Sequence, residues 1–88
     1  MNNNNQTPFI GMPCTKITGS DKTACRVLEV KRNGKTVIVG WENYAGKLFK
    51  STYSLRDNGR WIRKGEHKNY VTLSLELGKA ENHMDRSF

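Results

Sequence analysis

The residues of this chain that could do chemistry are cations interleaved with aromatic rings. Between Lys22 and Lys68 the sequence holds 12 lysines and arginines against 4 acidic residues, a net charge of +8 in a chain whose total is +7. Cations neutralise phosphates, and aromatic faces stack on nucleic-acid bases. This combination predicts binding of a phosphate-rich or acidic partner rather than a reaction. The candidate binding residues are Arg26, Lys31, Arg32, Lys35, Trp41, Tyr44, Lys50, Arg56, Arg60, Trp61 and Arg63.

The segment Arg56–Arg63 is the sharpest candidate within this set. Its turn ends in Asn58-Gly59, is flanked by arginines, and has Trp61 beside it. Arginine makes bidentate contacts with phosphate, so this turn could hold a phosphate or a base. The same residues could instead form a hairpin whose Trp packs on the end of the fold, and the sequence leaves both interpretations open.

The other aromatic residues divide by their place in the pattern. Tyr53 alternates with Phe49 and Leu55, which predicts a core position for Tyr53. Trp41 and Trp61 are expected at strand ends next to loops, where partial exposure is common.

The sequence indicates neither an enzyme nor a metal site. Cys14, Cys25, His67 and His83 lack the clustered spacing of metal ligands. Signatures of a nucleophile with its base, such as a glycine-flanked serine or a Cys/His pairing, are also missing. We therefore expect a non-enzymatic protein without a cofactor.

Composition also predicts the compartment. The sequence contains no run of about 18 apolar residues that could span a membrane. Its Asn-rich beginning lacks the basic and apolar regions of a secretory signal. Two cysteines are too few for a disulfide framework, so we expect reduced, partly buried thiols in a cytoplasmic protein.

Short apolar bursts separated by glycine turns predict one all-β domain, a small five- to six-stranded antiparallel barrel of the SH3-like or OB-like class. Residues 1–8 are expected to be a disordered Asn-rich N-terminus, residues 9–78 the barrel, and residues 79–88 a tail that could pack on it. The first burst, Gly11–Thr18, contains Pro13, which predicts an edge strand.

Two hairpins and a final strand are expected after that burst. Asn33-Gly34 predicts a type I′ turn between strands Ala24–Lys31 and Thr36–Trp41. The second hairpin is expected to join strands Leu48–Leu55 and Arg60–Arg63. In Tyr70–Leu77, the last strand, apolar and polar residues alternate strictly.

Three motifs resemble those of small uncharacterised proteins encoded by bacteriophages and prophages. They are Ser20-Asp21-x-x-Ala24-Cys25-x-Val27-x-Glu29-Val30 followed by Asn33-Gly34-Lys35-x-Val37, then Tyr53-x-Leu55-Arg56-x-Asn58-Gly59-Arg60-Trp61-x-x-x-Gly65, and finally Asp85-x-Ser87-Phe88. The resemblance covers about residues 20–88 and implies a phage accessory protein acting in the bacterial cytoplasm. It draws attention to Asp21, Arg56, Arg60, Trp61 and Phe88, which lie within the matching motifs.

Three classes of partner follow. The first is nucleic acid, bound through the basic and aromatic residues. The second is a host or anti-phage defence protein, inhibited in the manner of an anti-CRISPR protein, with Trp41, Trp61 and Arg60 as anchors. The third is a small signalling nucleotide, sequestered by the same arginine and tryptophan side chains.

Overall fold

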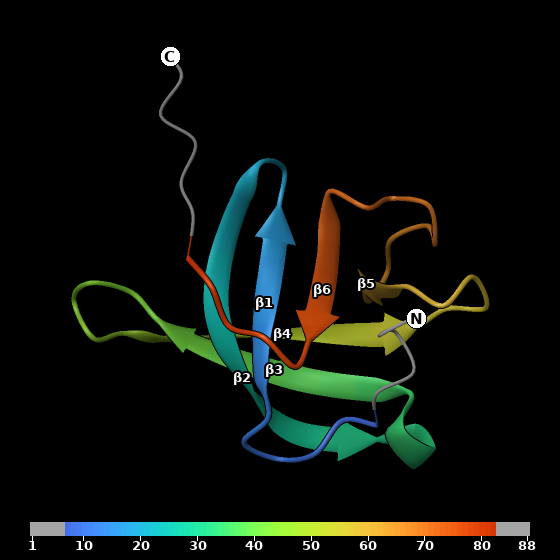
Figure 1. The fold of residues 1–88 in the computed structure, drawn as a ribbon, viewed down its shortest axis with the longest axis horizontal. Helices are drawn as coiled ribbons and strands as arrows, with labels where there is room; N and C mark the ends of the chain where they lie inside the picture. The colour runs from blue at the N-terminus through green and yellow to red at the C-terminus, as the bar shows by residue number, and fades with distance from the viewer. Residues whose placement is uncertain (1–6, 83–88) are drawn as a thin grey trace.

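The structure, a computed structural model, describes residues 7–82. Six antiparallel strands close into a barrel in sequence order, with β6 pairing back onto β1 (Figure 1). The strands are β1 (Pro13–Thr18), β2 (Asp21–Lys31), β3 (Thr36–Glu42), β4 (Leu48–Leu55), β5 (Trp61–Arg63) and β6 (Leu73–Leu77), and a single 3-10 turn, η2 (Arg32–Gly34), joins β2 to β3. The predicted all-β antiparallel barrel is confirmed, and its form is consistent with the SH3-like or OB-like class. Among residues 7–82, no helix has the length and apolarity needed to cross a membrane.

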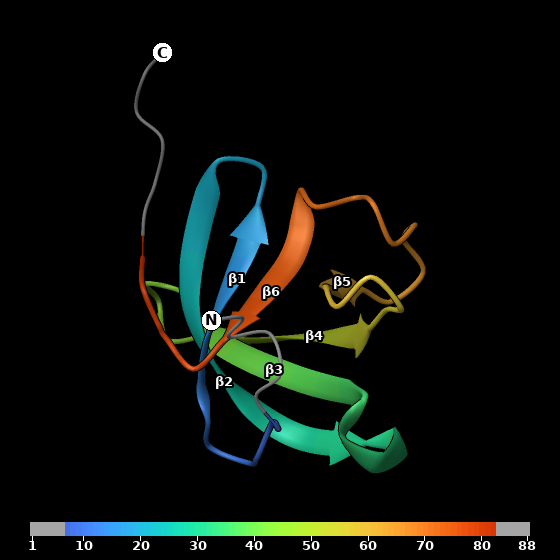
Figure 2. The ribbon, with the colours of Figure 1, turned by 45° about the vertical axis from the view of Figure 1, so that its right-hand side comes forward.

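Strand β2 takes part in both halves of the barrel, the half with β1 and β6 and the half with β3 and β4. Its first half pairs with β1 and its second half with β3, and the two meet at Arg26. The β1 and β6 strands therefore cross β3 and β4 at a steep angle (Figures 1 and 2). A bulge between Val27 and Glu29 helps β2 to bend between the two halves of the barrel.

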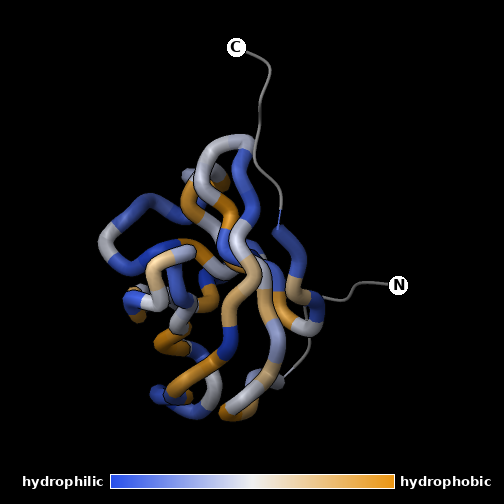
Figure 3. Tube along the Cα trace, turned by 90° about the vertical axis from the view of Figure 1, so that its left-hand side faces the viewer, coloured by the Kyte–Doolittle hydropathy of each residue, from blue (hydrophilic) through white to orange (hydrophobic). Residues whose placement is uncertain are grey.

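The barrel interior is filled by alternate residues of each strand, and hydropathy varies along the chain accordingly (Figure 3). The buried hydrophobic cluster comprises Met12, Cys14, Cys25, Val27, Val37, Val39, Tyr53, Trp61 and Leu75. Tyr53 is 1% exposed, which confirms its predicted core position. The same alternation continues past the cluster toward both ends of the barrel.

Cys14 and Cys25 face one another across β1 and β2 and are free thiols. Their Sγ atoms lie 3.1 Å apart in a hydrogen-bonded contact. That hydrogen bond and burial raise the pKa of the Cys14 thiol. The pair is more deeply buried than the sequence suggested, with Cys14 fully inaccessible.

Three strand predictions need correction. Strand β1 is not an edge strand, because β2 and β6 pair with its two sides. Pro13 is tolerated because it opens the strand, where its missing N–H removes no ladder bond, while its carbonyl accepts a hydrogen bond from Gly78 N at 2.8 Å. The last two strands are also shorter than predicted, since β5 starts at Trp61 and β6 starts at Leu73.

The predicted type I′ turn at Asn33-Gly34 is present. Asn33 (φ 57°) and Gly34 (φ 86°) both have positive φ, and Lys35 N donates to Arg32 O at 3.1 Å. Arg32 is also left-handed, with φ 54°, so the strand ladder closes one residue earlier, at Lys31 and Thr36. The result is a tight hairpin end with several exposed cations.

The terminal segments follow the barrel surface where they are described. Residues 79–82 pack on β1 and β2 through hydrogen bonds to Thr15 and Ala24 (Figure 1). Pro8 is buried, although it falls in the segment predicted to be disordered. Residues 1–6 and the motif at 85–88 lie outside the described residues.

Candidate nucleic-acid interface

The β3–β4 hairpin extends beyond the body of the barrel. Strand β3 pairs with β2 only as far as Gly40, whereas its pairing with β4 continues through Trp41 and Glu42. The hairpin loop therefore stands out from one side of the molecule (Figure 1). Inward-facing side chains of β3 and β4 are therefore accessible near the hairpin loop, where β2 no longer pairs beside them.

Trp41 and Phe49 form a stacked pair on the barrel-facing side of this hairpin. They are cross-strand partners and continue the inward alternation of Val39 and Ser51. Their ring centroids lie 5.9 Å apart with an interplanar angle of 21°. Phe49 is 37% exposed and Trp41 is half-buried, because no further strand of residues 7–82 covers the barrel at this point.

A lysine lies over each of these rings. Lys16 Nζ, from β1, lies 4.6 Å from the centre of the Trp41 ring, and Lys47 Nζ lies 5.5 Å from the centre of the Phe49 ring. Such cation–π contacts contribute roughly 0.5–1 kcal/mol each at accessible sites. Burial lowers the pKa of Lys16. Cys25 and Asp21 oppose this shift, and the charge of Arg63 adds to it.

The loop between the two strands holds Tyr44 away from the protein. The Asn43 side-chain oxygen accepts hydrogen bonds from Ala45 N at 2.9 Å and Lys47 N at 3.0 Å, and Asn43 N donates to Lys47 O at 3.0 Å. These bonds order a short loop whose tip carries a completely exposed tyrosine ring. We call Lys16, Trp41, Tyr44, Lys47 and Phe49 the hairpin surface.

The structure does not bring the predicted binding residues to one surface. Lys31, Arg32, Lys35 and Arg60 lie on the two Asn-Gly turns, which the 2.8 Å hydrogen bond from Leu55 N to Lys35 O holds side by side. These turns are at the far end of β3 from Trp41, roughly 17 Å along the strand at about 3.3 Å per residue. Arg26 and Lys50 form a separate row, since both are register partners of Gly40.

Three of the predicted residues are already engaged within the protein. Trp61 is 4% exposed, so the expectation of partial exposure is wrong and its ring does not offer a stacking face. Arg56 donates to Glu66 O at 2.7 Å, Ser54 Oγ at 2.9 Å and Arg63 O at 3.1 Å, which makes it a structural brace for the loop after β5. Arg63 forms a 3.1 Å ion pair with Glu66 but stays half-exposed.

The candidate binding residues omitted three members of the hairpin surface, which are Lys16, Lys47 and Phe49, although Lys47 lies within the basic segment 22–68. Lys16 lies within residues 1–21, whose net charge is zero, so the charge pattern did not draw attention to it. The alternation of β1 could have placed it on the inward face with Cys14. Phe49 has the inward orientation that the sequence predicted, but the open end of the barrel leaves it accessible.

Comparison of the chain with protein-family models, with curated proteins and with solved structures finds no match in any of the three.

Proposed function

We propose that the chain binds single-stranded nucleic acid through the hairpin surface. The observation that carries this proposal is the pair of stacked, accessible aromatic rings, each with a lysine ammonium over its face. Single-strand binders combine cations for the phosphates with aromatic side chains on which unpaired bases stack. Trp41, Phe49 and Tyr44 supply the rings, and Lys16 and Lys47 supply the charge.

A single strand fits this surface better than a duplex does. The bases of a duplex are stacked on each other, so a protruding ring such as Tyr44 has no free base to meet. Stacking on an aromatic side chain contributes about 1–3 kcal/mol per base. The two cations at the site correspond to a salt dependence with a log–log slope of about −1.4, at about −0.7 per phosphate for single strands.

The test is a titration of the full chain with a fluorescent random single strand and with a duplex of the same length, at low and physiological salt. Lys47→Gln should weaken single-strand binding about threefold to tenfold, while Lys64→Gln, which makes the same charge change elsewhere, should have little effect. Tyr44→Ser should weaken binding by a similar factor, and Tyr70→Ser, another exposed tyrosine, should not. Equal losses in the matched variants, or tighter binding of the duplex, would reject the proposal.

We also propose that the protein is a phage accessory protein working in a bacterial cytoplasm. The motif resemblance supports this setting, and the two free cysteines are compatible with a reducing compartment. Mass spectrometry of the protein, purified from bacterial cytoplasm and alkylated after denaturation without a reductant, should show two alkylated cysteines per chain. Recovery of an intermolecular disulfide would contradict the proposed compartment.

A further inference from the structure

Strand β2 has an edge that its neighbours leave open. Its residues 22–25 pair with β1 only, and β3 pairs with β2 no further than Gly40. In an antiparallel ladder, alternate residues turn their N–H and C=O groups away from the partner strand. Ala24 is such a residue, because its N–H donates to the side-chain oxygen of Asn82 at 2.9 Å. Among the described residues, the side chain of Asn82 therefore accepts the hydrogen bond that a carbonyl of a neighbouring strand would otherwise accept.

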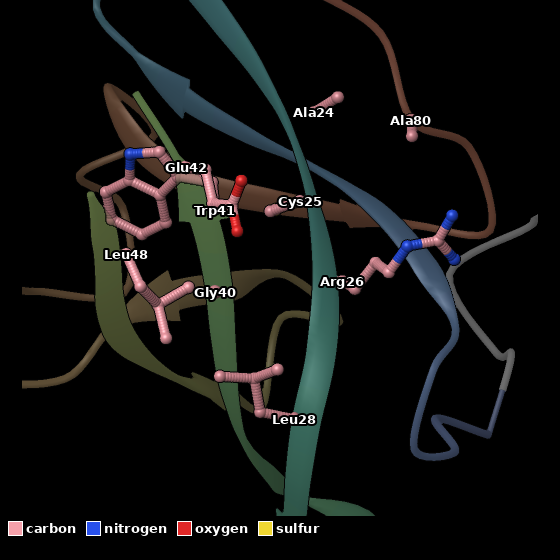
Figure 4. Close-up of a pocket in the computed structure, with 9 residues that line it drawn as sticks. All are labelled: Ala24, Cys25, Arg26, Leu28, Gly40, Trp41, Glu42, Leu48 and Ala80. Carbon is pink, nitrogen blue, oxygen red and sulfur yellow. The ribbon is translucent and has the colours of Figure 1, made fainter. Parts of the chain in front are cut away.

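A groove of about 380 Å³ lies where β2 and β3 separate (Figure 4). Its lining is largely apolar and comprises Ala24, Cys25, Arg26, Leu28, Gly40, Trp41, Glu42, Leu48 and Ala80. Gly40 has no side chain, so the side chain of Leu28 lies across it, and Leu48 is 51% exposed at the wall. The groove thus offers an apolar surface beside an open strand edge, on the opposite side of β4 from Phe49.

The segment Lys79–Asn82, which we call the strap, covers the edge of β2 (Figure 1). Thr15 Oγ1 donates to the Lys79 carbonyl and accepts from Glu81 N at 3.1 Å, and Lys22 Nζ lies 2.8 Å from Glu81 Oε1. The two side chains of this ion pair are 38% and 34% exposed, so the pair contributes little to stability. The chain thus places its own short peptide at the edge, with Glu81 as its acidic residue and with few contacts to hold it.

We propose that this groove is a peptide-binding site, in which an extended acidic segment of a partner protein adds to the edge of β2 and displaces the strap. The partner's main chain takes over the Ala24 N–H, an acidic side chain replaces Glu81 against Lys22, and an apolar side chain enters the groove between Leu28 and Leu48. Addition of a strand to an open edge draws its affinity from main-chain hydrogen bonds and its specificity from side-chain pockets.

Two observations favour a peptide as the occupant. The donor that the edge presents is the backbone amide of Ala24, and a peptide segment of the chain itself, the strap, already supplies its acceptor through Asn82. The charge also matches, because the chain carries +7 overall and Lys22 already pairs with an acidic residue of the strap. Trp41 belongs to both sites, whereas Tyr44, Lys47 and Phe49 of the hairpin surface do not line the groove.

The test uses a displayed library of random 12-residue peptides, panned against the immobilised full-length chain, and the synthetic form of an enriched peptide. We expect acidic peptides that shift the backbone amide signals of Ala24, Leu28 and Gly40. Leu48→Lys should weaken binding about tenfold, whereas Val71→Lys, at a similarly exposed position outside the groove, should not.

The strap gives a second arm to the experiment. Glu81→Gln with Asn82→Ala should strengthen peptide binding about threefold to tenfold, because the competing segment is loosened. Asp57→Asn breaks another exposed ion pair with the same charge change as Glu81→Gln and should leave peptide binding unchanged. Failure to enrich any peptide, insensitivity to Leu48→Lys, or weaker binding after the strap changes would overturn the proposal. Tyr44→Ser should alter oligonucleotide binding and leave peptide binding intact, so the two proposals fail separately.

Discussion

Lys16 holds its ammonium nitrogen 4.6 Å from the centre of the Trp41 ring, although the two residues come from strands that do not pair. This contact brings a cation from residues 1–21, whose net charge is zero, to the open end of the barrel. The two tryptophans of the chain also differ in exposure, since Trp41 is half-buried and Trp61 is buried in the core.

The fluorescence of the two tryptophans should therefore respond differently to added ligands. A single-stranded oligonucleotide should quench Trp41 and leave Trp61 unaffected. Trp41→Phe should abolish the quenching, and Trp61→Phe, the matched control, should retain it. Quenching that survives Trp41→Phe would place the bases somewhere other than the hairpin surface.

Arg56 and Arg60 should separate in a stability measurement although they flank the same turn. Arg56→Ala removes three hydrogen bonds and should lower the free energy of unfolding by about 2 kcal/mol. Arg60 is exposed, so Arg60→Ala should change it by less than about 0.5 kcal/mol. Urea unfolding of both variants measures the difference. Arg56→Lys should restore only part of the loss, because lysine lacks the planar fork.

Gly40 should be required because Leu28 lies across it. A Cβ atom at position 40 would stand 2.6 Å from Leu28 Cδ1 and 3.1 Å from Leu28 Cγ. Gly40→Ala should destabilise the protein by about 1 kcal/mol, as the leucine must shift. The loss should be smaller when Leu28→Ala is already present, and a double-mutant cycle by urea unfolding measures this coupling. Strict additivity would show that the two positions are independent.

Tyr53 should make the barrel sensitive to alkaline pH. Burial raises the pKa of Tyr53 from its ordinary value of 10.0 to about 12. Between these values the unfolded chain releases a proton that the folded chain keeps, so the free energy of unfolding falls as pH rises through this window. The stability of the wild type relative to Tyr53→Phe should fall by about 2 to 3 kcal/mol from pH 9 to 12. A constant difference between the two proteins would mean that the hydroxyl does not titrate in this way.

The strap should loosen in acid. Hydrogen bonds from Lys22 and then Lys79 hold the pKa of Glu81 below its ordinary value of 4.5. The hydrogen bond with Glu81 raises the pKa of Lys22 above its ordinary value of 10.5. Because the folded-state pKa of Glu81 is lowered, its contribution is complete above 4.5 and disappears as pH falls through the lower value. The Ala24 amide signal should therefore shift during an NMR titration from pH 7 to 3. In Glu81→Gln the signal should lack this transition.

Local patterns were sufficient for the strands and turns. Alternation in β4 predicted the inward orientation of Phe49 and Tyr53, and Asn33-Gly34 predicted its turn, because side-chain period and positive φ depend on a few neighbouring residues. Predictions that needed to know which strands meet were less successful. Pro13 suggested an edge, but a strand becomes an edge only through its absent neighbour, and barrel closure supplies β6.

The sequence by itself determined an all-β domain with a basic, aromatic-rich middle, because composition and alternation are properties of the linear chain. Only the tertiary structure decided which of those residues can meet a ligand. It buried Trp61, engaged Arg56 as a brace, separated the turn cations from Trp41, and added Lys16 to the hairpin surface. The physical reason is that exposure depends on where each strand pairing stops. The hairpin surface and the groove both exist because β3 continues beyond Gly40, where its pairing with β2 ends.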